Sequence, residues 1–460
     1  MRPTVVLNVV GLSPELLGED TPHINALVAS GTLRPLVTVT PAVTCTVQST
    51  LLTGKLPSEH GIVANGWYFR ELSEIWFWRQ SNQLVQAKKL WELARERDPS
   101  FTVANLFWWY NMYSSADWAV TPRPMYPADG RKLPDIHTAP NELRRELQDR
   151  LGQFPLFHFW GPAADIRASR WIAQAALHVM QTRSPTLTLV YLPHLDYGLQ
   201  RLGPDLASPR LRQDLREVDA LVGELAEAAQ KSGRRVVVLS EYGITKVSGA
   251  VALNRALRAQ GWLQVREELG RELLDAGASD AFAVADHQLA HVYVRKPELL
   301  REVRACLTAL DGVERVLDRQ EQQELGLNHA RAGELVAISR ADRWFSYYYW
   351  LDAERAPDFA TSVDIHRKPG YDPVELFLNP KLAWPPFSIG WRLARKKLGF
   401  RGLMDVIAAD APELVKGSHG RITDDPRQGP LFISDEPSLS GSGPLAATDV
   451  AALLLSHVFD

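Results

Sequence analysis

A threonine between a strand-like and a helix-like segment is the first candidate for chemistry. Thr44 follows Thr40-Pro-Ala-Val and precedes a run that predicts a helix over 44–52. A hydroxyl at such a turn lies where backbone N–H groups converge, which favours an attacking alkoxide and binds phosphate oxygens. Because a neutral threonine is a poor nucleophile, this role requires a base or a metal ion. Taken alone, the position is more typical of a threonine that caps a helix.

Apolar runs separated by helix-like segments must position this threonine. Residues 5–10, 187–192 and 236–239 are apolar and rich in β-branched side chains, as in buried parallel strands. Residues 209–231 have the apolar spacing of a helix, and a loop with His194 and Asp196 is expected after residue 192. The alternation predicts an α/β fold with a doubly wound, mostly parallel sheet. Its functional loops are expected at the carboxyl ends of the strands.

The pattern of apolar and polar residues changes after about residue 245. A β-α-β-β pattern across residues 291–338 predicts a smaller α+β cap, and loops rich in proline and aromatic residues follow it. We therefore expect three segments: the first part of the core at 1–245, an inserted cap with loops at 246–410, and the C-terminal part of the core at 411–460.

The composition is that of a soluble globular protein. Hydrophobic residues make up 45% and charged residues 23% of the chain, which argues against extensive disorder. The formal net charge of −3 provides no basic field, so no nucleic-acid partner is expected. Cys45 and Cys306 are the only cysteines and cannot form a disulfide framework or a cysteine-based zinc site. No apolar run reaches the roughly 18 residues of a membrane span, and a cytoplasmic protein is the expectation.

A basic amphipathic stretch covers residues 391–401. It is most often simply a solvated helix face. Aromatic side chains lie beside it, so contact with a lipid surface or an anionic substrate is the less favoured alternative. The residues concerned are Arg392, Arg395, Lys396, Lys397 and Arg401, with Trp384, Phe387 and Trp391.

The threonine segment resembles the nucleophile segment of nucleotide pyrophosphatase/phosphodiesterases and of phosphonoacetate hydrolases, both in the alkaline phosphatase superfamily. Further segments match in the same order along the chain. The shared features are Thr21-Pro22, Thr44, Thr53-Gly54, Pro57, His60-Gly61-Ile62, Asn65, Tyr191-Leu-Pro-His-Leu-Asp196, residues 236–243, Arg331-Ala-Gly-Glu-Leu and Lys416-Gly-Ser-His419-Gly420. The resemblance implies an alkaline-phosphatase-like core that carries the inserted cap.

The same resemblance implies roles for individual residues. Thr44 is then the nucleophile and a metal ligand, and Asn65 holds a phosphate oxygen. Asp196 and His419 bind a first metal ion, and Glu241 replaces an aspartate ligand of a second. We expect these five side chains to converge in one pocket. The implied function is a metal-dependent phosphoryl-transfer hydrolase of the phosphodiesterase/nucleotide pyrophosphatase type. Its substrate would be a small phosphodiester, pyrophosphate or phosphonate.

Three positions depart from the family pattern. Val10 stands in place of an aspartate, and Gln200 and Tyr242 stand in place of histidines. Valine cannot ligate a cation, and an oxygen-rich set favours magnesium or manganese over zinc. The metal is therefore zinc, manganese or magnesium, with one or two ions. The alternative function is a catalytically reduced member that binds a phosphorylated or prenylated metabolite without turnover.

Replacement ligands are expected from the inserted region. Two segments outside the matched motifs, 286–291 and 364–372, are rich in potential ligands. His366 is the first choice, because Arg367 and Lys368 beside it suit a phosphate. For each segment the alternative is ordinary structural or surface polarity. The candidates are Asp286, His287, His291, Asp364 and His366.

Overall fold

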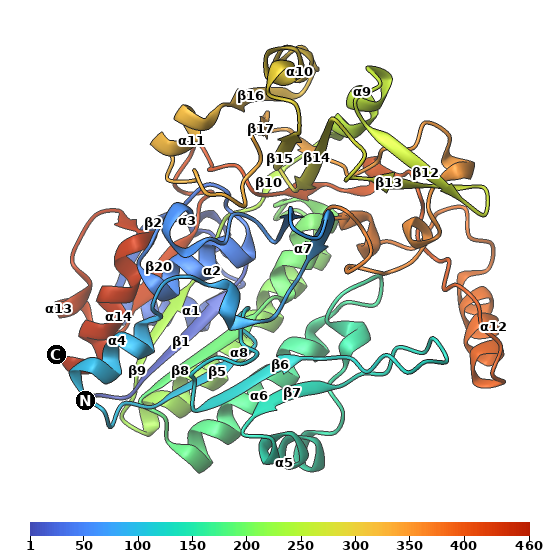
Figure 1. Ribbon diagram of the computed structural model, residues 1–460. Helices are drawn as coiled ribbons and strands as arrows, with labels where there is room; N and C mark the ends of the chain where they lie inside the picture. Colours follow the sequence, from blue (N-terminus) through green and yellow to red (C-terminus); the bar gives the residue numbers. More distant parts are fainter.

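Buried apolar strands form the centre of the molecule. Every residue of β1 (Thr4–Val9) is buried, and the strand pairs in parallel with β8 (Leu187–Leu192) and with β9 (Arg235–Leu239). A strand that is covered on both faces is expected to be apolar along its whole length. The computed structural model describes residues 1–460 apart from the side chain of Ser440, and it places these strands in the middle of a nine-stranded sheet (Figure 1).

The large sheet is parallel in its middle and antiparallel near its edges, as the sequence predicted for a doubly wound core. The C-terminal segment supplies two of its strands. In spatial order the strands are β21 (Leu445–Ala446), β2 (Thr32–Val37), β20 (Leu431–Ser434), β9, β1, β8, β5 (Val103–Leu106), β6 (Trp118–Pro122) and β7 (Ile136–Ala139).

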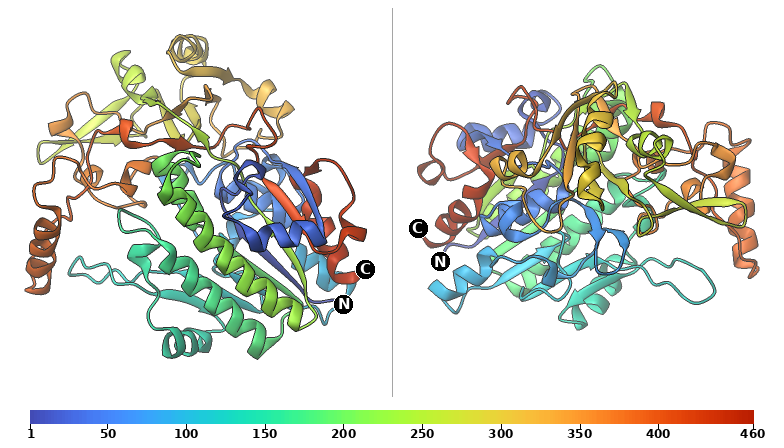
Figure 2. Two further views of the ribbon diagram at one scale, coloured as in Figure 1. Left: turned by 180° about the vertical axis from the view of Figure 1, so that it is seen from behind. Right: turned by 45° about the horizontal axis from the view of Figure 1, so that its top comes forward.

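Helices cover both faces of this sheet. Figure 2 shows α6 and α8 side by side on one face, and Figure 1 shows α2, α4 and α14 on the other. The helices of the core are α1 (Pro22–Ser30), α2 (Thr44–Thr53), α3 (Pro57–His60), α4 (Leu90–Arg97), α5 (Glu142–Leu151), α6 (Ile166–Arg183), α7 (His194–Leu202), α8 (Pro209–Lys231), α13 (Pro437–Ser440) and α14 (Val450–Phe459).

The cap has a sheet of its own. Its four strands are antiparallel, and none of the strands from 249 to 345 belongs to the large sheet. The domain limits at 245 and 410 remain predictions. The elements are β14 (Ala281–Asp286), β15 (Leu289–Val294), β17 (Leu335–Ser339) and β16 (Val313–Leu317), with α9 (Leu253–Ala259), α10 (Leu300–Thr308), α11 (Arg319–Glu324) and the hairpin β12 (Gln264–Glu268)–β13 (Arg271–Asp275).

Short ladders connect the segments that enter and leave the cap. The first, β10 with β19, brings the chain before the cap against the segment that contains His419. These ladders are β10 (Thr245–Lys246) with β19 (Gly417–Ser418) and β11 (Gly249–Val251) with β18 (Arg343–Phe345). A separate hairpin in the first part of the chain pairs β3 (Gly66–Phe69) with β4 (Glu74–Phe77). One further helix, α12 (Pro385–Lys397), projects from the rest of the chain (Figure 1).

One predicted loop is a helix. The sequence predicted a loop after residue 192, but α7 begins at His194, directly after its N-cap Pro193. Leu195, Leu199 and Leu202 recur at a spacing of four and three residues and pack against the main core. The prediction was wrong because this short apolar repeat lies inside a polar motif. As a consequence, Asp196 sits in the first turn of a helix.

Candidate active site

Thr44 is the first residue of α2, and its hydroxyl does not cap the helix. The N-cap is Val43, whose side chain cannot accept a hydrogen bond. Thr44 is buried, and its Oγ lies 3.0 Å from the hydroxyl of Tyr242. The capping interpretation therefore does not hold, and the Thr44 hydroxyl faces other functional groups at the positive end of a helix.

A chain of hydrogen bonds continues from Tyr242 through Asp196. The Tyr242 hydroxyl donates to Asp196 Oδ1 over 3.3 Å, and Gln200 Nε2 donates to Asp196 Oδ2 over 2.7 Å. The Tyr371 hydroxyl donates in turn to Gln200 Oε1 over 2.9 Å. Tyr242 and Gln200, two of the three residues that depart from the family pattern, thus donate hydrogen bonds to the Asp196 carboxylate.

Four rings are stacked along the same side of the site. Tyr242 lies flat on His419, with centroids 3.6 Å apart and an interplanar angle of 6°. His287 follows at 3.7 Å from His419, and Tyr371 at 3.6 Å from His287. His287 comes from the cap and His419 from the returning core segment, so the stack joins the two parts of the chain.

Two amide side chains surround the other carboxyl group, that of Glu241. Asn8 Nδ2 and Gln48 Nε2 both donate to Glu241 Oε1 over 2.6 Å. Gln48 is held in this orientation because its own Oε1 accepts the backbone N–H of Trp109 over 2.7 Å. We call Asn8, Gln48 and Glu241 the amide cage. The Oε2 atom of Glu241 is buried and has no hydrogen-bond partner among the described residues.

Backbone contacts hold His419 between the core and the cap. The Gly420 carbonyl accepts from the Ala42 N–H, and the His419 carbonyl accepts from the Gln288 N–H. Gly420 has φ of +112°, and a Cβ there would lie 3.0 Å from the Gln288 nitrogen, so glycine is required. The His419 Nδ1 contacts the Ala42 carbonyl at 2.8 Å, while its Nε2 is buried without a partner among the described residues.

Burial dominates the electrostatics of the site. It raises the pKa of Glu241 to about 8 and that of Asp196 to about 7, and contacts with the amide and hydroxyl groups offset this in part. One of those contacts is between the Thr44 hydroxyl and the Glu241 carboxyl, and it lowers the Glu241 pKa. Burial also lowers the pKa of His419 well below its ordinary value, so its imidazole is neutral near pH 7.

Three of the five residues expected in one pocket, Thr44, Asp196 and His419, each contact Tyr242, and the fourth, Glu241, directly precedes Tyr242 in the chain. Asp196 Oδ1 lies 3.9 Å from His419 Nε2. Asn65 lies beside these residues, but both the oxygen and the nitrogen of its side-chain amide form hydrogen bonds within the protein. Its Oδ1 accepts the Cys45 N–H over 2.9 Å, and its Nδ2 donates to Asp286 over 3.1 Å. In this arrangement Asn65 orients the start of α2, and its role towards phosphate stays a prediction.

The candidate replacement ligands divide into two groups. Asp286 and His287 reach the site, where His287 Nδ1 lies 2.7 Å from Asp286 Oδ1 and its ring lies 3.7 Å from that of His419, tilted by 38°. His291 does not, because its two ring nitrogens contact the Val63 carbonyl and the Gly333 N–H.

The first choice among the replacement ligands, His366, is also outside the site. Its Nδ1 lies 3.4 Å from the Phe77 carbonyl, and no hydrogen bond, ion pair or ring contact among the described residues joins it to Asp196, Glu241 or His419. The Asp364 carboxylate faces Arg367 instead, 3.9 Å away. The basic residues next to His366 in sequence did not indicate a phosphate site, because Lys368 is buried between Asp372 and Glu375.

The donor set does not fit a pair of metal ions. Val10 is apolar and fully buried, and Glu241 Oε1 already accepts two short amide hydrogen bonds. Within the described residues, no three histidine, cysteine or carboxylate ligands around Thr44 have donor atoms within 4.8 Å of one another. Asp196 Oδ1 and His419 Nε2 lie 3.9 Å apart, and the neutral imidazole nitrogen has no hydrogen-bond partner among the described residues, so these two side chains could hold one cation.

Sequence reasoning missed three residues of the site: Asn8, Gln48 and Tyr371. Gln48 carried a signal, since it follows Thr44 by one helical turn and therefore shares its face of α2. Asn8 is a polar residue in an otherwise apolar buried strand, which is unusual enough to mark it. Tyr371 lies in the segment 364–372 that was singled out, although for other residues.

A second group of potential ligands lies between α7 and α8. His194 Nε2 is 3.2 Å from Asp214 Oδ1 and 3.3 Å from Glu217 Oε2. Arg210 also lies 2.8 Å from the same Asp214 oxygen. The cluster is thus a polar contact between the two helices, in which Arg210 pairs with one of the two carboxylates that His194 contacts.

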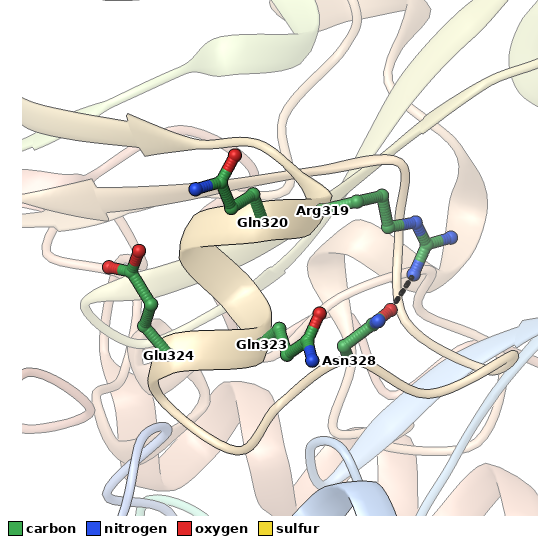
Figure 3. A pocket seen from close by; sticks show the side chains of 5 residues that line it. All are labelled: Arg319, Gln320, Gln323, Glu324 and Asn328. Atoms are coloured by element: carbon green, nitrogen blue, oxygen red, sulfur yellow. Dashed lines mark hydrogen bonds between the residues drawn. The ribbon is translucent and has the colours of Figure 1, made fainter.

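A pocket on the cap surface is separate from this site. It surrounds α11, and Figure 3 shows the hydrogen bond between Arg319 and Asn328 at one side of it. Its lining residues are Arg319, Gln320, Gln323, Glu324 and Asn328, none of which was predicted to bind substrate or metal.

Comparisons with known proteins agree with this arrangement of the chain. The family model described as type I phosphodiesterase / nucleotide pyrophosphatase matches residues 4–372. The ectonucleotide pyrophosphatase/phosphodiesterase 2 of Saccharomyces cerevisiae is 26% identical over 208 residues, which are 43% of this chain and 36% of the yeast protein. The match therefore spans about a third of the length of that relative.

Solved structures share the fold across the whole chain. An inactive variant of murine ectonucleotide pyrophosphatase / phosphodiesterase 5, in complex with AMP, has a TM-score of 0.59 at 15% identity, covering 100% of this chain and 95% of that one. Phosphonoacetate hydrolase from Sinorhizobium meliloti 1021, in complex with phosphonoformate, has a TM-score of 0.61 at 15% identity, covering 99% and 96%. At these identities the likeness concerns the fold.

Proposed function

The chain belongs to the type I phosphodiesterase / nucleotide pyrophosphatase family, and we propose that it is a phosphoryl-transfer hydrolase with Thr44 as its nucleophile. The observation that carries the proposal is the placement of the Thr44 hydroxyl. It stands at the N-terminus of α2, 3.0 Å from the Tyr242 hydroxyl and near the Glu241 carboxyl, whose pKa it lowers. A nucleophile and a group able to accept its proton are thus neighbours.

The Glu241 carboxylate is the proposed general base. The amide cage satisfies its Oε1, while Oε2 is left without a partner among the described residues. A carboxylate fixed by one oxygen and open at the other can accept a proton without moving. Its raised pKa is close to that of an effective base near neutral or mildly alkaline pH.

The first step forms a bond between Thr44 Oγ and phosphorus and breaks the bond to the leaving oxygen. The Thr44 proton passes to Glu241 Oε2, and the leaving oxygen takes a proton from solvent. Water then attacks the phospho-threonine and releases one proton to solvent, the bond between phosphorus and Oγ breaks, and Glu241 returns the proton to Oγ. Tyr242 holds the Thr44 oxygen in place through both steps.

Asp196 and His419 are the proposed ligands of one divalent cation. One carboxylate oxygen and one neutral imidazole nitrogen suit zinc or manganese better than magnesium. Such a cation would supply positive charge to the phosphoryl oxygens. The substrate class is a small phosphodiester, pyrophosphate or phosphonate.

The test is turnover of bis-p-nitrophenyl phosphate by the full chain, with Thr44→Ala compared with Thr44→Ser. We expect Thr44→Ala to lose at least about 10³-fold in kcat and Thr44→Ser to retain measurable turnover, because only the serine keeps a hydroxyl. Equal activity of the wild type and of a folded Thr44→Ala variant would exclude the threonine as nucleophile.

The burial of the site favours a second function. Thr44 is only 4% exposed, and ring stacking and amide donors fill the positions of ligands in the family pattern. The chain would then bind a phosphorylated or prenylated metabolite without turnover. Thermal stabilisation by a phosphorylated compound, with no turnover over a range of added zinc, manganese and magnesium, would select this function.

A further inference from the structure

One helix projects from the body of the molecule with an apolar and basic outer face. No residue of α12 is buried, and Figures 1 and 2 show the helix extending away from the sheet and the cap. It is attached through its inner side, where Ile389 packs with Leu382 and Met404 against a small core cluster. Its outer side has no partner within the described residues.

The outer face carries an aromatic stripe. Trp384, Phe387, Trp391 and Leu398 follow one another at spacings of three, four and seven residues, which places them on one side of a helix. They are 82%, 74%, 58% and 75% exposed. Leaving side chains of this size in water forgoes roughly 1.5–3 kcal/mol each relative to full burial, so the stripe is poorly suited to solvent.

Further apolar side chains extend the stripe into a patch. Several of the chain's exposed large apolar residues fall within a segment of twenty residues, which exceeds the scattered exposure normal for a soluble surface. We call this segment, residues 384–403, the α12 patch. Its exposed apolar members are Trp384, Phe387, Trp391, Leu393, Leu398, Phe400 and Leu403.

A segment far away in sequence lies beside the patch. Arg401 Nη2 donates to the Ala128 carbonyl over 3.0 Å, which ties the patch to the loop between β6 and β7. That loop presents Met125 and Tyr126, 42% and 58% exposed, and Figure 1 shows it reaching towards α12. Two independent segments therefore present apolar side chains at the same edge.

Basic side chains accompany the apolar ones. Arg395, Lys396 and Lys397 occupy the last turn of α12, and none of them forms an ion pair with a described carboxylate. Arg392, on the inner side, is paired with Asp405 over 2.6 Å. The unpaired charge is thus concentrated in the last turn of the helix.

We propose that the α12 patch docks this protein on an anionic phospholipid bilayer. An amphipathic helix with tryptophan, phenylalanine and leucine on one side and lysine and arginine beside them lies in the plane of the lipid interface. The aromatic rings enter the headgroup region, and the cations meet the phosphates of anionic lipids. None of the described helices is long and apolar enough to cross a bilayer, so the attachment is peripheral.

A second copy of the chain is a less suitable occupant of this patch. A symmetric pairing would bring the unpaired cations of both copies near one another, with no carboxylate on the patch to balance them. An anionic lipid surface matches both the charge and the apolar stripe. The inference does not depend on the proposed chemistry at Thr44.

The experiment is co-flotation of the full chain with phosphatidylcholine vesicles, with and without phosphatidylglycerol, alongside tryptophan fluorescence. Two triple variants are compared: Trp384→Ser/Phe387→Ser/Trp391→Ser and Arg395→Glu/Lys396→Glu/Lys397→Glu. Matched controls place the same changes on exposed residues elsewhere, Phe157→Ser and Arg170→Glu. Circular dichroism and the Tm of every variant establish that the fold is retained.

We expect the wild type to bind the vesicles with phosphatidylglycerol, with a blue shift of tryptophan emission, and to be released by salt. The charge variant should bind at least about 100-fold more weakly, since each basic residue near such a surface contributes roughly a factor of five. The aromatic variant should lose the blue shift, and the controls should bind as the wild type does. Absence of binding, or equal binding by folded variants and wild type, overturns the proposal. So does a dimer in solution that only the aromatic variant dissociates, since it would assign the patch to self-association.

Discussion

The two buried carboxyl groups beside Thr44 have opposite surroundings. Glu241 is held by the amide cage, in which two amide N–H groups share one of its oxygens. Asp196 accepts one hydrogen bond from an amide and one from a phenol. It also faces an imidazole nitrogen that has no hydrogen-bond partner within the described residues. In the first half, protein groups satisfy Glu241 Oε1 but leave Oε2 without a partner among the described residues. In the second half, Asp196 Oδ1 and His419 Nε2 lie 3.9 Å apart.

This difference separates two roles that a dinuclear site would combine. Amide donors compensate a carboxylate without neutralising it, so Glu241 remains able to take up a proton. The pair of Asp196 and His419 has the donor types of a metal site but only two strong ligands. We infer that the position filled by a second ion in the family pattern is served here by uncharged hydrogen-bond donors.

The largest expected difference between the two halves is in how substitutions of Glu241 and Asp196 change kcat and the amount of bound metal. Glu241→Gln should lower kcat by about 10²–10⁴-fold, the usual contribution of a general base, and leave the bound metal unchanged. Asp196→Asn should lower both. Steady-state kinetics and elemental analysis on the same preparations measure this. Loss of metal in Glu241→Gln would return that residue to the metal site.

The pH dependence of stability sharpens the comparison further. Burial raises the folded-state pKa of Glu241 to about 8, from 4.5. The folded state therefore binds the proton that the unfolded state has released, and stability falls as pH rises from about 4.5 to 8.

Glu241→Gln removes this dependence. Relative to the wild type, the variant should therefore gain on the order of 4 kcal/mol in unfolding free energy between pH 5 and pH 8. Urea unfolding in the presence of a chelator at both pH values measures the gain. A constant difference between the two proteins would mean that Glu241 is ionised in the folded state.

Metal affinity is expected to depend on Asp196 and His419 and not on Glu241. His419→Ala should weaken zinc or manganese binding by about 10–100-fold, because it removes the only imidazole that faces Asp196. Isothermal titration should also give no more than one ion in this site of the wild type. His23→Ala, an exposed histidine outside the site, is the control. Two ions lost together on His419→Ala would contradict the single-cation site.

The smallest expected effect on kcat comes from substituting Tyr242, whose hydroxyl connects the two halves of the site. Tyr242→Phe removes the hydroxyl that joins Thr44 to Asp196 but keeps the ring stacked on His419. Loss of one hydrogen bond of about 1 kcal/mol predicts a decrease in kcat of roughly fivefold, with unchanged metal affinity. A decrease beyond 10³-fold would instead identify the phenol as part of the proton path.

Much of the scaffold, and the placement of Thr44 at the start of a helix, could be predicted from the order of residues along the chain. The strand at 187–192 and the helix at 209–231 were located to the residue, because burial on both faces and the helical repeat leave clear apolar patterns. The segments of Thr44, Asp196, Glu241 and His419 were identified because they resemble motifs of the family that occur in the same order along the chain.

The partners of those residues were decided only by the tertiary structure. Asn8 and Glu241 are 233 residues apart in sequence, and Tyr371 and Gln200 are 171 apart. A local pattern gave His366 preference over His287, yet the turn after β14 directs His287 into the ring stack. A sequence specifies which side chains can donate or accept hydrogen bonds. Which of them meet depends on how the core and the cap pack, since the free energy of a buried hydrogen bond exists only after distant segments have been brought together.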